Sequence, residues 1–268
     1  MCGRYLIEDE AYADILQILN DINAAKKRIN MDNLTVTGEI FPTNVVPVII
    51  GNNSSISTND NQSNTPSGDP DNDSGIVDIV AIQWGFPHWN NPSVIINARS
   101  ETAAEKNMFK RPLKNRRCVV PSSGFYEWGH RTGNTPGNPA GNTPTPNYAP
   151  NNTAYGGFAT RNTKRKPRKD KYLFRKPDEP ILYMAGIIST FKDSFGEKFD
   201  AFVILTTAAN ECVEPIHDRM PVILTPDEID PWTNDEKFIE FAIRRPGPEL
   251  SSVLTNDKPT EYFGNILD

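Results

Sequence analysis

Short apolar segments separated by polar turn residues recur along most of this chain. They are rich in β-branched and aromatic residues, and their length and composition are typical of β-strands. The pattern predicts strands over residues 44–50, 75–86, 116–121, 124–128, 171–175, 181–189 and 199–207. Within GFYEW (124–128), the alternation of a strand places Glu127 on the same face as Phe125 and opposite Tyr126 and Trp128.

Helical spacing is rarer than strand-like alternation. In residues 8–28, apolar side chains recur at helical intervals, and acidic residues precede basic ones, as the helix dipole favours. Residues 102–109 and 225–229 each begin with a Thr that is followed three positions later by a Glu, which is a capping-box pattern. We therefore expect helices to begin near Thr102, with Ser100 as the alternative cap, and near Thr225.

The strands outnumber the helices and do not strictly alternate with them, which favours an α+β class over a doubly wound fold. We expect a barrel-like, mainly antiparallel β core with a few flanking helices. Two polar stretches, 51–75 and 131–170, hold too few apolar side chains to offset the cost of ordering them. Because they fall between predicted strands, we interpret them as disordered insertions within one domain that spans residues 2–268.

Composition narrows the class of protein. The net charge of −6 excludes a basic nucleic-acid coat, so any nucleic-acid binding must come from a local basic patch. Three cysteines, no long apolar run and no signal peptide predict a soluble intracellular protein without disulfides. The cluster KRKPRK (164–169) is either a nuclear import signal or a solvated or DNA-binding loop, which predicts a nuclear location in a eukaryote and a cytoplasmic one otherwise. The spacing of Cys and His predicts no metal site, and no cofactor is expected.

Cys2 directly follows the initiator Met. A thiol at a fraying terminus can be accidental, and an exposed one is prone to oxidation. If Met1 is removed, however, Cys2 carries an α-amine and a thiol on adjacent carbons, with reference pKa values of about 8 and about 8.5. Both groups are then partly nucleophilic near neutral pH. Gly3 allows close approach of a ligand, and Arg4 can contact a phosphate.

Three further stretches place polar residues in apolar or turn-forming surroundings. Asn97 and Arg99 in VIINARSET follow three β-branched residues, which places Asn97 at the end of a predicted strand, and a strand-to-helix turn does not explain either residue. Glu127 is either an edge residue in solvent or a buried acid whose raised pKa suits it to move protons near pH 7. His217 in EPIHDRMPVIL is either a structural histidine in a turn or an acid–base group.

Taken in this order, MCGR, NARSET, GFYEW and IHDRMP resemble the hallmark sequences of the SOS response-associated peptidase (SRAP) family, with FPTN, WGF and LTTAAN matching between them. The resemblance spans essentially the whole chain outside the two polar stretches. That family includes proteins that cross-link covalently to abasic sites in single-stranded DNA.

The resemblance implies a specific chemistry. The amine of Cys2, freed by removal of Met1, would form a Schiff base with the aldehyde of an abasic sugar, and the thiol would close a thiazolidine ring that protects the strand from β-elimination. Asn97 would hydrogen-bond near the amine, Glu127 would orient the amine and shuttle its protons, and His217 would open the sugar ring and assist reversal. The same group could cleave a peptide bond ahead of Cys2.

The resemblance also implies a DNA-contacting cleft. Its expected members are Arg4, Pro42, Asn44, Trp84, Phe86, Arg99, Trp128 and Thr206. The two arginines are expected at phosphates, and Trp84 and Phe86 as a wedge that stacks on bases. Asn107 stands where some members have a basic residue, so that contact is expected to be missing or supplied by nearby cations, namely Lys106, Lys110 or Arg111.

The expected partner is single-stranded DNA with an abasic site, or a junction of single- and double-stranded DNA, bound by a monomer without a membrane or a metal; replication proteins are possible further partners. Two other functions stay open at this point. One is a cysteine peptidase that acts mainly on peptides, and the other is a non-covalent single-strand binding module.

Overall fold

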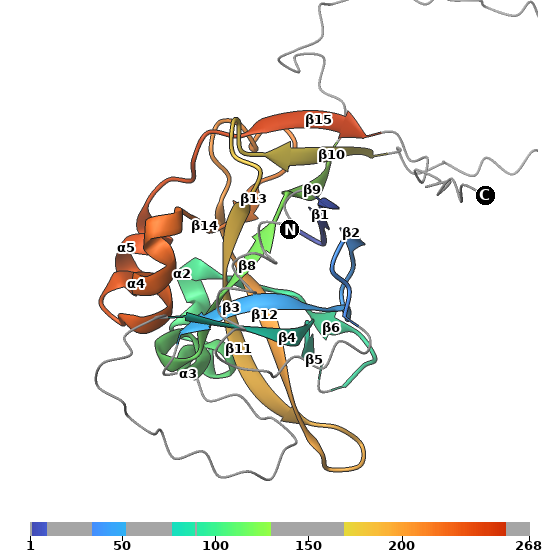
Figure 1. The fold of residues 1–268 in the computed structure, drawn as a ribbon, viewed down its shortest axis with the longest axis vertical. Coiled ribbons are helices and arrows are strands. Elements are labelled where there is room, and N and C mark those ends of the chain that lie inside the picture. Colours follow the sequence, from blue (N-terminus) through green and yellow to red (C-terminus); the bar gives the residue numbers. More distant parts are fainter. Residues whose placement is uncertain (1, 10–33, 52–76, 89, 130–168, 256–268) are drawn as a thin grey trace, which may run out of the picture.

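The computed structural model describes residues 2–9, 34–51, 77–88, 90–129 and 169–255 (Figure 1). Its strands are β1 (Arg4–Ile7), β2 (Gly38–Ile40), β3 (Val45–Gly51), β4 (Val77–Trp84), β5 (Phe86–Pro87), β6 (Val94–Ile95), β7 (Asn97–Arg99), β8 (Arg117–Ser122), β9 (Gly124–Gly129), β10 (Asp170–Arg175), β11 (Leu182–Lys192), β12 (Lys198–Ala208), β13 (Arg219–Pro221), β14 (Ile223–Leu224) and β15 (Ser251–Thr255). Its helices are α2 (Ser100–Ala103), α3 (Asn107–Asn115), the 3-10 helix η1 (Pro226–Glu228), α4 (Ile229–Asn234) and α5 (Phe238–Arg244).

Five of these strands close into a ring. Strand β12 pairs with β4, β4 with β3, β3 with β8, β8 with β11, and β11 returns to β12. All these pairings are antiparallel except β12–β4, which is parallel. The short strands β7 and β13 also pair with β12, and β14 pairs with β11. The prediction of a barrel-like, mainly antiparallel α+β core is therefore confirmed.

A second sheet of five strands has the order β15–β10–β9–β1–β2, and all its pairings are antiparallel. The N-terminal strand β1 lies inside this sheet, between β2 and β9. The turn between β8 and β9 fixes it further, because Ser123 N–H donates to Leu6 O at 2.7 Å and Ser123 Oγ accepts from Glu8 N–H at 2.8 Å. In Figure 1 this sheet lies above the ring, while the helices gather along one side.

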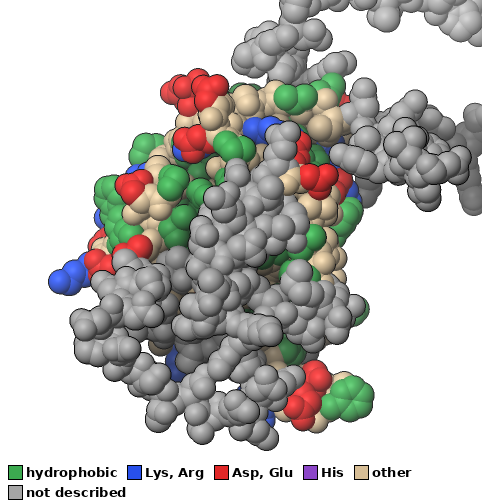
Figure 2. Space-filling model, viewed as in Figure 1, with side chains coloured by type: hydrophobic (Ala, Val, Ile, Leu, Met, Phe, Trp, Pro, Cys, Tyr) green, Lys and Arg blue, Asp and Glu red, His purple; other side chains and the backbone are tan. Residues whose placement is uncertain are grey.

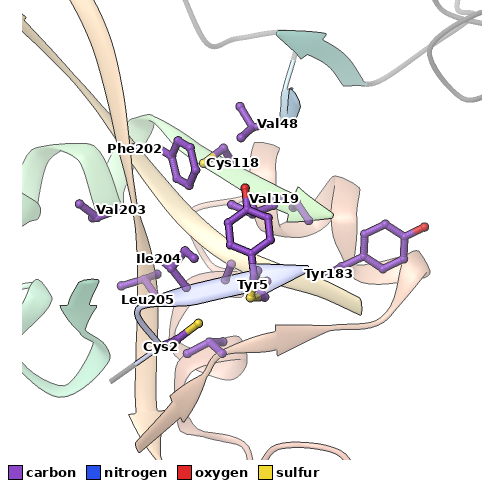
Figure 3. Close-up of a cluster of buried hydrophobic side chains, with 14 of the residues drawn as sticks. Cys2, Tyr5, Val48, Cys118, Val119, Tyr183, Phe202, Val203, Ile204 and Leu205 are labelled. Carbon is purple, nitrogen blue, oxygen red and sulfur yellow. The ribbon is translucent and has the colours of Figure 1, made fainter. Parts of the chain in front are cut away.

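The core joins the two sheets. Tyr5 of β1 is fully buried, and its ring lies 5.2 Å, centroid to centroid, from that of Trp84 in β4. Trp84 in turn stacks on Phe202 of β12 at 6.4 Å. Figure 3 shows the ring of Tyr5 pointing toward Phe202 and Cys118, with Cys2 on the N-terminal segment below it. The N-terminus is thus anchored by burial of apolar surface, which is the main stabilising contribution to folding.

Every strand predicted from the sequence is present. The prediction for residues 75–86 is divided into β4 and β5 by a bend at Gly85, whose φ of +112° is a conformation that favours glycine. The short strands β1, β2, β7, β13, β14 and β15 were not predicted; pairing with distant segments stabilises them, and local patterning does not reveal it.

The helix predictions have mixed outcomes. At residue 225 the predicted helix start is confirmed, since Thr225 N–H donates to Glu228 Oε2 at 2.9 Å and Pro226 is the first helical residue. At residue 102 the prediction is wrong: α2 begins at Ser100, directly after β7, so that Thr102 lies inside the helix. The predicted helix over residues 8–28 lies almost wholly outside the described residues.

The two polar stretches connect strands that pair with each other. Gly51 at the end of β3 is opposite Val77 of β4, and Gly129 at the end of β9 is opposite Asp170 of β10. Each stretch therefore joins two antiparallel strands that are direct neighbours; the disorder predicted for both stretches and most of the cluster at 164–169 lie outside the described ranges.

None of the described helices is long and apolar enough to cross a membrane. On the face shown in Figure 2, basic side chains of the described elements are scattered singly among acidic ones.

Candidate active site at the N-terminal strand

Cys2 lies at the start of β1, beside the middle of the second sheet. Its side chain is fully buried, and its Sγ is 3.5 Å from the carbonyl oxygen of Arg4. The antiparallel register pairs Arg4 with Tyr126 and Tyr5 with Phe125, so that continuing it by one residue sets Gly3 opposite Glu127. The strand pairing therefore brings the N-terminal segment to Glu127.

Glu127 is a buried acid, with only 1% of its surface exposed. Strand β9 is flanked by β1 and β10, so the alternative of an edge residue in solvent is wrong. Burial raises the pKa of Glu127 from its ordinary value of 4.5 to about 7. The carboxyl group is therefore close to half protonated near neutral pH and can both accept and donate a proton.

His217 reaches the site on a turn that packs against the end of β9. A Cβ at Gly129 would lie 2.6 Å from the carbonyl oxygen of Ile216, so only glycine permits this approach. His217 N–H donates to Val213 O at 2.9 Å, and His217 Nδ1 accepts from Arg219 N–H at 3.0 Å. That second bond leaves the proton of the neutral imidazole on Nε2.

The same nitrogen, Nε2, lies 3.7 Å from Glu127 Oε2. The separation is too long for a direct hydrogen bond but allows charge coupling. Burial lowers the pKa of His217, and this outweighs the exposed carboxylate of Asp218, whose Oδ1 is 3.0 Å from Nδ1. The site thus holds a neutral imidazole beside an acid that titrates near pH 7.

Asn97 reaches the site from the other sheet. Its Nδ2 donates to the carbonyl oxygen of Cys2 at 2.9 Å. It is the first residue of β7, which lies parallel to β12 with Asn97 opposite Ile204, rather than the last residue of a strand as the sequence indicated. An amide on the ring of strands therefore orients residue 2 on the second sheet.

The thiol of Cys2 is held in its protonated form. Burial and the negative charge of Glu127 both raise its pKa well above the ordinary value. A buried thiol is a poor nucleophile until its proton is removed. Any reaction of Cys2 that starts at its amine therefore finds the sulfur still carrying a proton.

Two charged groups beside this site were not singled out from the sequence. Arg219 forms a bidentate ion pair with Glu101, at 2.5 and 2.9 Å, and its Nη2 donates to Thr206 O at 2.5 Å. It thereby ties α2 and β12 to the strand that follows His217.

The second group is Glu39, which links two cations of the second sheet. Its Oε1 accepts from Arg4 Nη1 at 2.8 Å, and its Oε2 lies 2.7 Å from Lys171 Nζ. Residues 39, 4 and 171 are far apart in the sequence, and only the pairing of β2 with β1 and of β9 with β10 reveals this link.

The predicted DNA contacts divide into accessible and buried residues. Arg99 is exposed, and Arg4, Pro42, Asn44 and Trp128 are half-buried at the surface around the N-terminal strand. The Arg4 guanidinium lies over the ring of Trp128, 5.3 Å from its centroid. These five residues are placed where a ligand can reach them.

The two residues predicted to form a base-stacking wedge are not accessible in this structure. Trp84 and Phe86 are fully buried, Trp84 against Tyr5 and Phe202, and Phe86 against Phe109 and Phe191. Rings with no exposed face cannot stack on a base in this arrangement. Thr206 is also fully buried, and its oxygen atoms face Arg219 rather than the surface.

Within the described ranges, no group of three or more His, Cys, Asp or Glu side chains is arranged to hold a metal ion. The site as described consists of a thiol, a carboxyl, an imidazole and an amide, and we derive its chemistry from these groups.

The chain is similar to several known proteins. Abasic site processing protein YoqW of Bacillus subtilis is 29% identical over 242 residues, which cover 87% of this chain and 80% of that protein. Abasic site processing protein HMCES of Gallus gallus is 34% identical over 187 residues, covering 64% of this chain and 48% of that protein. A crystal structure of a protein from Bacteroides thetaiotaomicron superposes with a TM-score of 0.61 at 21% identity, covering 96% of this chain and 93% of that one, which shows a shared fold.

The model of one protein family matches residues 1–148 and 155–245, a span that contains all four groups of the site. On this match, the chain belongs to the SOS response associated peptidase (SRAP) family.

Proposed function

We propose that this protein detects abasic sites in single-stranded DNA and joins itself to them through Cys2 after Met1 has been removed. The observation that carries the proposal is that Asn97 and Glu127, from two different strands, both lie at the buried second residue of the chain, with His217 beside Glu127. The names of the relatives YoqW and HMCES, both abasic site processing proteins, support it.

The reaction needs no cofactor, oxidant or reductant. The ring-opened abasic sugar presents an aldehyde, and the free α-amine of Cys2 attacks its carbon to form a carbinolamine. Loss of water gives an imine. The Cys2 sulfur then bonds to the imine carbon while its proton passes to the nitrogen, which yields a thiazolidine. One water molecule leaves in total, and ring closure removes the imine from which the 3′ phosphate would be eliminated.

The electrostatics of the site favour this order of steps. Because burial and Glu127 raise the pKa of the Cys2 thiol, the amine is the better first nucleophile, and the thiol still carries the proton that ring closure transfers. Glu127, with a pKa of about 7, can protonate the departing hydroxyl group and later accept a proton from the amine. Neutral His217 can take the proton of the sugar hydroxyl when the ring opens.

DNA binding would rely on cations around the site. Arg4 and Arg99 would contact phosphates; exposed Lys106 directly precedes α3, and α3 itself carries exposed Lys110 and Arg111. Contacts of this kind make affinity fall steeply with salt. We expect the protein to bind as a monomer.

A peptidase activity is a second candidate, because Glu127 lies beside Cys2 with His217 next to it, and the family is described as a peptidase family. Glu127 would activate water at the bond between Met1 and Cys2, and the product would be the free N-terminal Cys2 that the first proposal requires.

One assay separates these functions from simple binding. The purified protein is incubated with single-stranded DNA that carries one abasic site, and the products are resolved under denaturing conditions. An adduct that survives denaturation supports cross-linking, cleavage of peptides without an adduct supports the peptidase, and retention on DNA with neither product supports a non-covalent binding module. A chain with an extra residue ahead of Cys2 that cannot be removed should give no adduct.

A further inference from the structure

Phe41 is an aromatic residue that is held open to solvent beside the N-terminal strand. Its side chain follows β2 directly, and 43% of its surface is exposed. Ile40, the residue before it, is opposite Tyr5 in the register of β1 and β2, so continuing the register by one residue sets Phe41 beside Arg4. This ring is accessible at the site, unlike those of Trp84 and Phe86.

The turn that carries Phe41 is rigid. Phe41 N–H donates to Asn44 Oδ1 at 2.8 Å, and Asn44 N–H donates back to Phe41 O at 3.1 Å. Thr43 N–H and Trp84 N–H then bond this turn to β4, at 2.8 and 2.9 Å. Thr43 has a φ of +75°, which is costly for a β-branched residue and is typical of backbone strain kept at functional sites.

One face of the Phe41 ring is covered by a cation. The Arg4 guanidinium carbon lies 4.6 Å from the Phe41 centroid, within the range of a cation–π contact. Arg4 cannot easily leave, because Glu39 holds its Nη1 at 2.8 Å and Lys171 holds Glu39. Lys171 Nζ in turn lies over the ring of Tyr126, 4.0 Å from its centroid.

This arrangement is connected to the nucleophile. Arg4 is two residues from Cys2, and its carbonyl oxygen is the contact of the Cys2 thiol at 3.5 Å. A ligand that rests on Phe41 and Arg4 therefore lies two residues along the N-terminal segment from Cys2, on the face of the sheet that carries Tyr126 and Trp128, while Glu127 lies on the opposite face. Two cations bound to one carboxylate leave a net positive charge here, which favours an anionic ligand that also has a flat apolar part.

We propose that Phe41 is a nucleobase-stacking residue that holds a base next to the abasic position, with Arg4 behind its ring. The inference rests on the proposed function, since an abasic nucleotide has no base of its own and must be held through its neighbours. Stacking accepts any base, which suits a protein that must act in every sequence context. Phe41 is then a binding residue, and the rigid turn keeps it from folding onto the protein surface.

Fluorescence of a base analogue tests this inference directly. Single-stranded oligonucleotides carry one abasic site with 2-aminopurine on its 5′ side in one set and on its 3′ side in another. Stacking on an aromatic ring quenches 2-aminopurine, so the wild-type protein should quench one of the two positions. Phe41→Ala should abolish this quenching and weaken DNA binding about tenfold, whereas Phe41→Trp should keep both.

Phe195→Ala is the matched control, because Phe195 is 89% exposed in the turn between β11 and β12, away from β1. It should leave quenching and affinity unchanged. Affinities are measured in a Cys2→Ala background so that covalent capture does not hide the equilibrium, and thermal unfolding confirms that each variant is folded.

The possible failures are distinguishable. If the wild-type protein forms an adduct, but Phe41→Ala quenches and binds like the wild type, the stacking role is refuted while cross-linking stands. If no adduct forms, but quenching and affinity still depend on Phe41, cross-linking is refuted and stacking stands for non-covalent binding.

Discussion

Cys2 and Cys118 are both fully buried thiols, yet their surroundings differ in kind. Cys118 lies on β8, where a Cβ at Gly186 of β11 would come within 2.8 Å of its sulfur. Burial alone raises its pKa far above the ordinary value, opposed only by the charge of Arg116. Cys2 has a carboxyl, an amide and the end of the chain beside it. Burial alone keeps a thiol protonated, so any chemistry at Cys2 would depend on the polar groups that surround it.

The largest expected difference is in adduct formation between Cys2→Ala and Cys118→Ala. Cys2→Ala should abolish the adduct with abasic DNA completely, because it removes the thiol that closes the ring. Cys118→Ala should form the adduct at the wild-type rate and lose only about 1 kcal/mol of stability from the small cavity. Denaturing gels and urea unfolding measure the two effects. An adduct that persists in Cys2→Ala, or that is lost in Cys118→Ala, would contradict the assignment of Cys2 as the reacting thiol.

Removing the carboxyl group of Glu127 should make Cys2 nearly as unreactive as Cys118. Glu127→Gln keeps the shape of the side chain but cannot transfer protons, so cross-linking at saturating DNA should slow about a hundredfold. DNA affinity should be retained, because Glu127 is buried. Glu214→Gln, an exposed residue of the turn before His217, is the control and should react normally. Equal losses of rate and affinity in Glu127→Gln would refute its role as a proton shuttle.

The raised pKa of Glu127 also predicts how the stability of the folded protein depends on pH. The pKa of Glu127 rises from 4.5 when exposed to about 7 when folded, so between these values the folded state keeps a proton that the unfolded state has lost. Stability therefore falls as pH rises through this window, by about 3 kcal/mol in total. The lowered pKa of His217 acts in the opposite sense, but His217 is present in both the wild type and Glu127→Gln.

Glu127→Gln has no charge to bury and should escape this loss. Its stability relative to the wild type should therefore grow by about 3 kcal/mol between about pH 4 and about pH 8. Urea unfolding at both pH values measures it. A difference that does not change with pH would mean that Glu127 ionises as freely as an exposed acid.

The smallest expected effect is at Asn97. Asn97→Asp keeps the shape of the side chain but removes the donor to the Cys2 carbonyl, so residue 2 is less well oriented and the cross-linking rate should fall about tenfold. Single-turnover rates at saturating DNA measure this. An unchanged rate would assign Asn97 a purely structural role between the two sheets.

Local patterns predicted the ring of strands and the face on which Glu127 lies. Alternation placed Glu127 with Phe125, but the depth of burial came from the flanking strands β1 and β10, which no local pattern reveals. Likewise, the short segment before residue 8 became a strand because β2 and β9 pair with it on both sides.

The errors have the same origin. The family resemblance implied that Trp84 and Phe86 stack on bases, but in this structure they pack against Tyr5, Phe202 and Phe191. Thr102 has a helix-capping pattern, yet β7 ends at Arg99, so the helix starts at once. Motifs selected the candidate residues, whereas tertiary packing decided which of them are accessible.

The central claim is that the free amine and the thiol of Cys2 together capture an abasic sugar. Intact mass spectrometry of the denatured adduct, followed by peptide mapping, tests it most directly. The claim predicts a mass equal to the chain without Met1 plus the DNA, less one water, with the DNA attached at Cys2. An adduct that retains Met1, or one attached to Cys118, Cys212 or a lysine, would contradict it.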